Sequence, residues 1–202
     1  MKKLTALLLG VVLSVSLVAC GNNSDNNTES TGTESTGTEA TNNAGGDTTE
    51  DVFKDVAMTD LKTAVTDVLG ENYWPQMALD AEMLSSMCGI SADMYDDFLA
   101  EMPMMSAHID TMIIIKAKDG QVEAVEAALN TYRDSLVENS LYPSHVAKSQ
   151  ASRIEAFGNY VCFILLGGDT TSVEEQGDEA TITYCQEENE KALDAIRTAL
   201  TE

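Results

Sequence analysis

Basic residues are scarce in this chain of 202 residues. Eleven lysines and arginines stand against 34 aspartates and glutamates, which gives a formal net charge of −23. Residues 1–51 hold seven of the acids and two of the lysines, so residues 52–202 keep 27 acids and nine bases. No stretch interleaves basic with aromatic residues, so we expect no nucleic-acid partner. Anionic lipid would repel such a surface, and the acidity is best read as a source of solubility.

Histidine is almost as rare, and no catalytic motif is present. The chain has two histidines, His108 and His145, and neither a CxxC pair nor zinc-ligand spacing. Nucleophilic catalysis would need one of these imidazoles within hydrogen-bond reach of a Ser or Cys and of an acid. Nothing in the sequence places them so. We therefore predict no catalytic residue, no cofactor and no enzyme, with a hydrolase of unrecognised site as the alternative.

Only one long apolar run occurs, and it lies at the N-terminus. Lys2 and Lys3 precede an apolar segment over residues 4–18. It is shorter than the ~20 residues of a spanning helix but fits the ~7–15-residue core of a signal peptide. The following Leu17-Val18-Ala19-Cys20 resembles the bacterial lipobox. An ordinary signal peptide that happens to contain a cysteine is the rival interpretation.

The lipobox implies cleavage before Cys20 and attachment of lipid to that cysteine. Residues 1–19 are then a lipoprotein signal peptide. Each buried CH₂ contributes ~0.8 kcal/mol, so two or three acyl chains, palmitate among them, would hold the protein to the membrane. We expect a protein anchored by lipid to the outer, extracytoplasmic face of the cell membrane.

Residues 20–51 are predicted to be a disordered tether. Residues 21–51 have no Lys or Arg and include the tandem repeat ESTGTESTGT at 29–38. Such polar, low-complexity sequence cannot bury enough apolar surface to offset chain entropy. A flexible chain of this length spans roughly 30 Å.

Residues 52–202 are predicted to form a single α+β domain. Apolar spacing with caps and glycine stops predicts helices. They run from Thr59 to Gly70, from Asp80 to Gly89, from a Ser91 cap onward, from Asp119 through Glu138, and over Glu187–Leu200.

Strand signals lie between these helices. Thr111–Ala117 is β-branched and apolar on both faces, so it is predicted to be a central strand. Arg153–Phe157 and Tyr160–Leu166 flank Gly158-Asn159, a two-residue hairpin signal. Met102–Ala107 is a further candidate strand. We expect an antiparallel sheet of three or four strands covered by helices.

Several short segments together resemble a bacterial lipoprotein family. They are DAEMLSSMCG at 80–89, MPMMS at 102–106, IIIKAK at 113–118, Leu141-Tyr142-Pro143 and Gly158-Asn159-Tyr160-Val161. In this order they are similar to the domain-of-unknown-function family 4358, over about residues 59–169. The family has no established activity to carry over, so the resemblance implies location and fold only.

Three cysteines remain besides Cys20, namely Cys88, Cys162 and Cys185. Their odd number leaves at least one thiol unpaired. Three interpretations remain: three free and mostly buried thiols, a Cys162–Cys185 or Cys88–Cys162 disulfide, or one reactive thiol.

Methionine is concentrated in the middle of the chain. Eight of the ten methionines are Met77, Met83, Met87, Met94, Met102, Met104, Met105 and Met112. Packing in a core is the expected role, with an adaptable partner surface or copper(I) binding as alternatives. Met102, Met104, Met105 and His108 are weak candidates for metal ligands, and strand alternation would point Met104 and Met105 to opposite faces. We predict no metal site on that ground.

Trp74, next to Pro75, either caps a core or binds a sugar.

Taken together, the sequence predicts a lipid-anchored extracytoplasmic protein that acts as a non-enzymatic binding or structural module. This interpretation implies a cell-surface protein as the class of partner, without identifying it. The alternative is a small thiol- or copper-handling protein.

Overall fold

The computed structural model describes residues 52–105 and 107–202. The predicted signal peptide, the lipidation of Cys20 and the tether lie outside the described residues. Among residues 52–105 and 107–202, no helix is long and apolar enough to cross a membrane. The elements are α1 (Met58–Leu69), η1 (Gly70–Asn72), β1 (Met77–Ala78), α2 (Ala81–Cys88), β2 (Tyr95–Met102), β3 (Thr111–Ala117), α3 (Val122–Asn139), α4 (Pro143–Ala151), β4 (Arg153–Phe157), β5 (Tyr160–Leu165), α5 (Thr171–Glu174) and α6 (Asp178–Thr201).

The predicted α+β class with a helix-covered antiparallel sheet is confirmed. The strands lie in the order β1-β2-β3-β5-β4, and every neighbouring pair is antiparallel. The sheet has five strands among the described residues, whereas three or four were predicted. The additional short strand β1 pairs Met77 with Met102, and two residues are too few to leave an alternation signal in the sequence.

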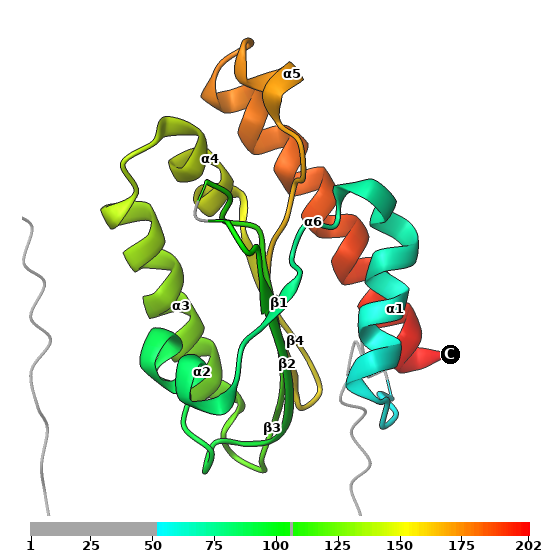
Figure 1. Ribbon diagram of the computed structural model, residues 1–202. Helices are drawn as coiled ribbons and strands as arrows, with labels where there is room; N and C mark the ends of the chain where they lie inside the picture. Colours follow the sequence, from blue (N-terminus) through cyan, green and yellow to red (C-terminus); the bar gives the residue numbers. More distant parts are fainter. Residues whose placement is uncertain (1–51, 106) are drawn as a thin grey trace, which may run out of the picture. The chain divides into compact units, whose positions relative to one another are not determined.

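Helices cover both faces of the sheet, with α2 and α3 on one side and α1 and α6 on the other (Figure 1). The central strand β3 is buried on both faces, as predicted. Met112 and Ile114 pack in the cluster with α1 and α6, while Ile113 and Ile115 pack in the cluster with α2 and α3. This alternation follows from the two-residue period of a strand.

The helix predictions succeed where local caps are strong. Asp80 accepts a hydrogen bond from the Met83 amide at 2.8 Å and begins α2, which ends at Gly89 with φ +71°. Such a left-handed residue at a helix end favours glycine. Gly70 likewise ends α1, and α3 begins near the predicted start.

Two predictions in the middle of the chain are wrong. The segment after Ser91 is a turn and then strand β2, because residues 95–102 pair with the central strand instead of coiling locally. Met102–Ala107 is not a strand: β2 ends at Met102, and Pro103 follows without the amide hydrogen that a ladder needs.

The C-terminal half contains more helix than predicted. Pro143 occupies the first turn of α4, where its missing amide hydrogen has no partner to lose. Helix α6 starts at Asp178, well before the predicted Glu187, and packs along α1 and α4.

Candidate functional site

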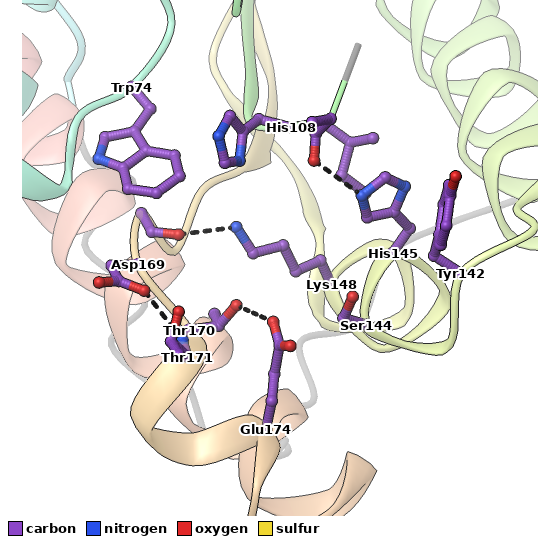
Figure 2. A pocket seen from close by; sticks show the side chains of 13 residues that line it. Trp74, His108, Tyr142, Ser144, His145, Lys148, Asp169, Thr170, Thr171 and Glu174 are labelled. Atoms are coloured by element: carbon purple, nitrogen blue, oxygen red, sulfur yellow. Dashed lines mark hydrogen bonds between the residues drawn. The ribbon is translucent and has the colours of Figure 1, made fainter. Parts of the chain in front are cut away.

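A cleft of about 710 Å³ lies at the end of the sheet where β5 stops and β3 begins. Four segments that are distant in the sequence meet there: the loop before β1, the loop before β3, the N-terminal part of α4, and the loop from β5 into α5 (Figure 2). Its lining side chains are Trp74, Ala107, His108, Ile109, Tyr142, Ser144, His145, Lys148, Asp169, Thr170, Thr171 and Glu174, with Gly168.

A buried ion pair lies under the cleft. Lys148 Nζ lies 2.8 Å from Asp110 Oδ2, and the two side chains are 5% and 0% exposed. The same ammonium donates to the Gly168 carbonyl at 2.9 Å, and the Gly168 amide donates to Asp110 Oδ1 at 2.9 Å. These contacts form a closed ring that joins α4, the start of β3 and the loop after β5.

Gly168 is required in this ring for two reasons. Its φ of +54° is a conformation that residues with a side chain rarely adopt. A Cβ at this position would also lie 2.8 Å from the Asn72 backbone. A larger residue would therefore push the loop after β5 away from Asn72 and disturb the hydrogen bonds of Gly168 with Asp110 and Lys148.

Aromatic side chains form the upper walls. Trp74 Nε1 donates to the Glu71 carbonyl at 3.0 Å, which fixes the indole. The His108 ring meets the indole in an edge contact at 4.4 Å between centroids, and Lys148 Nζ lies 5.5 Å from the indole centroid. Across the cleft, the Tyr142 and His145 rings are 5.1 Å apart.

Both histidines line this one cleft, which the sequence could not predict. His145 lies on α4, and its Nε2 is 3.1 Å from the Ala107 carbonyl. Within residues 52–105 and 107–202, neither imidazole hydrogen-bonds a thiol, a hydroxyl or a carboxylate. The arrangement therefore lacks the nucleophile–base contact that marks covalent catalysis.

Polar groups of the loop after β5 form the lower wall. Thr170 Oγ1 donates to Glu174 Oε1, and the Thr171 amide donates to Asp169 Oδ1 at 3.0 Å. Hydrogen bonding from Thr171 lowers the pKa of Asp169, so this carboxylate is ionised at neutral pH. Figure 2 shows these carboxylates below Trp74 and opposite Ser144.

The three cysteines of the domain are free and buried, so the disulfide readings are wrong. Burial raises the pKa of Cys88 to about 12 and that of Cys185 to about 11. Burial also raises the pKa of Cys162, which lies in the core. Thiols in such surroundings are weak nucleophiles at neutral pH.

The methionines divide into two groups. Met112 is fully buried, and Met77, Met83, Met87, Met94 and Met102 pack against the core on the α2 and α3 side, as the packing interpretation predicted. Met104 and Met105 are 74% and 62% exposed. They line a second hollow of about 470 Å³ beside the cleft, together with Trp74 and His108.

Sequence reasoning did not identify the ion pair or the residues of α4. Lys148 carries no signal of its own in a sequence, because burial and pairing with Asp110 arise only from the tertiary structure. Two signals were available in the sequence. Pro143 is typical of a helix start, and the consecutive glycines Gly167-Gly168 indicate a close approach of the backbone to another segment. A Cβ at Gly167 would lie 2.7 Å from Cys185 Sγ, so Gly167 marks a close approach of this loop to α6, whereas Gly168 lies against Asn72.

Residues 69–166 match the family described as Domain of unknown function (DUF4358). The matched range runs from the end of α1 to the end of β5 and includes Trp74, both histidines and Lys148. The similarity to this family that the short sequence segments indicated is therefore confirmed over residues 69–166. No curated protein and no solved structure matches the chain.

Proposed function

We propose that this protein is a lipid-anchored extracytoplasmic binding protein, and that the cleft above Lys148 holds a neutral, hydroxyl-rich ligand such as a saccharide. The proposal depends on one observation. Aromatic rings and polar groups from four segments face the same cleft. Ligand sites commonly combine apolar walls with a few polar groups that fix the orientation of the ligand.

The chemistry of the lining favours a sugar. Trp74 and Tyr142 offer flat apolar surfaces to the C–H faces of a ring, and each carries a polar edge. Ser144 and Thr171 can donate to or accept from ligand hydroxyls, and Glu174 can accept.

Charge argues against an anionic ligand. The one ammonium in the lining, that of Lys148, is already neutralised by Asp110. Asp169 and Glu174 add negative charge to the opposite wall, and the domain as a whole is acidic. A phosphate or carboxylate would meet repulsion on that wall.

The cleft lies far from the point where the described chain begins. The first described residues pack at the opposite end of the sheet, where Phe53 meets Phe157 at 5.9 Å between ring centroids. Asp55 is held there by Lys116 at 2.6 Å and by Tyr160 at 2.8 Å. The first described residues therefore lie at the end of the sheet opposite the cleft, so a chain that enters there does not cover the cleft.

We also propose that the protein binds its ligand without catalysing a reaction on it. The thiols are buried with raised pKa values, so they are protonated at neutral pH. Lys148 is held by two acceptors, which leaves its ammonium unsuited to act as a base or nucleophile.

Calorimetric titration with a panel of neutral mono- and disaccharides tests the proposal. We expect one binding site in the wild-type protein and weaker binding in Tyr142→Ala, because the ring lines the cleft. Leu141→Ala is the matched control, since Leu141 is the adjacent residue, is 90% exposed and does not line the cleft. No heat with any sugar, or equal losses in both variants, would refute a saccharide site.

A further inference from the structure

The turn between β2 and β3 carries two methionines that the core does not use. Met104 and Met105 remain largely exposed, although the other six methionines of this region are packed or buried. Their thioethers therefore need an explanation other than core packing. A single exposed methionine would be ordinary, but two neighbours beside the only tryptophan form a distinct chemical surface.

The backbone removes the objection that strand geometry raised. Residues 104 and 105 lie in a bend, so the alternation that would separate their side chains does not apply. The His108 amide donates to the Met105 carbonyl at 3.2 Å and closes a turn. Met104, Met105 and His108 consequently line one hollow, closed by Trp74.

We infer that Met104, Met105 and His108 form a binding site for Cu(I) beneath the Trp74 indole. Cu(I) is a soft cation that favours thioether sulfur and also accepts imidazole nitrogen. The electron-rich face of an indole attracts a nearby cation. Trp74 and His108 also line the cleft, but the inference does not depend on the saccharide proposal, because it rests on the thioethers of Met104 and Met105, which lie outside the cleft.

Selectivity follows from the same ligand set. Thioethers are poor ligands for Zn²⁺, which prefers Cys, His and carboxylates. Within the part of the chain that the structure describes, no three such residues are grouped so as to hold a metal. The exposure of both methionines would let the ion enter from solvent and be passed on.

The indole is also the reporter for a test, since Trp74 is the only tryptophan in the chain. The mature chain from residue 20, carrying Cys20→Ser, is titrated with Ag(I) while tryptophan emission is followed. In parallel, Cu(I) under anaerobic reducing conditions is titrated against bicinchoninate. We expect one equivalent of Cu(I) to be withheld from the competitor, and Ag(I) to change the emission until one equivalent is bound.

Met104→Leu and Met105→Leu should each weaken Cu(I) binding by more than about tenfold, because loss of even an outer-shell partner of a metal costs about 10–100-fold. His108→Asn should do the same. Met87→Leu is the matched control, since it removes a thioether on α2 that packs against the core, and it should leave Cu(I) affinity unchanged. Met104 and Met105 are largely exposed, so both leucine variants should fold, and a Leu at Met87 nearly conserves the side-chain volume.

Two results would overturn the inference. In the first, bicinchoninate keeps all the Cu(I) in the wild-type titration. In the second, the Met104→Leu, Met105→Leu double variant binds as tightly as the wild type, which would place the metal on the thiols. Zn²⁺ matching Ag(I) in its effect on tryptophan emission would also contradict a soft-metal site.

Discussion

The ion pair of Asp110 and Lys148 should contribute strongly to stability, because both partners are almost wholly removed from water. Lys148→Met removes the ammonium and leaves the Asp110 carboxylate buried with only the Gly168 amide as a partner. Breaking a buried pair in this way costs about 3–5 kcal/mol. A protein of this size loses about 2–4 °C of melting temperature per kcal/mol, so the expected fall is roughly 6–20 °C.

A double-mutant cycle separates the pair from its two members. Asp110→Asn keeps an oxygen that can accept from the Gly168 amide, but it leaves the Lys148 ammonium buried with only the Gly168 carbonyl. In the Asp110→Asn, Lys148→Met double variant no charge is buried, so much of the loss should be recovered. Urea unfolding monitored by circular dichroism gives the free energy of unfolding for all four proteins.

The interaction energy of contacting charged residues is typically about 0.5–3 kcal/mol in such cycles. The reasoning would be refuted if the single variants each lost less than 1 kcal/mol, or if the double variant lost the plain sum of the two. Lys62→Met gives a matched control, because Lys62 pairs with Glu101 at 2.6 Å but is 38% exposed. Its loss should be smaller than that of Lys148→Met.

Three further predictions concern the anchor, the tether and the thiols. The intact mass of the protein from the membrane fraction should show loss of residues 1–19 and added acyl mass. Cys20→Ala should give an unprocessed precursor or a released protein. Normal processing and unchanged membrane retention of Cys20→Ala would contradict the lipid anchor. Deleting residues 23–50 from the mature Cys20→Ser chain should leave the melting temperature unchanged, because disordered residues contribute no burial, and a drop of several degrees would mean that the segment packs on the domain. A pH of 8 lies below the raised pKa values of Cys88 and Cys185, so both thiols remain protonated. In the same Cys20→Ser chain, an Ellman assay should therefore detect almost no thiol until the protein is unfolded. Rapid labelling of the folded protein would contradict the burial of these thiols.

Local signals explain which parts of the fold were predictable. Asp80 and Gly89 mark α2 through a cap and a left-handed stop, both of which act within a few residues. Gly158 similarly marks the turn between β4 and β5, and its φ of +60° is the conformation that a tight hairpin needs. Continuous β-branched sequence identified β3 because that strand is covered on both faces.

Non-local pairing explains what the sequence did not predict. Residues 95–102 form β2 because the edge of β3 requires a partner, and no local pattern encodes that requirement. The ring of Asp110, Lys148 and Gly168 joins positions up to 58 residues apart. The cleft depends on this ring, so neither its location nor the meeting of His108 and His145 could be read from spacing along the chain.

Amide chemical-shift mapping of the mature Cys20→Ser chain, titrated with the best sugar from the panel, tests the binding cleft most directly. The account predicts that the shifted amides belong to Trp74 and to residues 107–109, 142–148 and 167–174, with little change near Phe53 and the β4–β5 hairpin. Saturable shifts confined to those segments would support the cleft as the ligand site. No shift with any sugar, or shifts centred on α1 and α6, would contradict it.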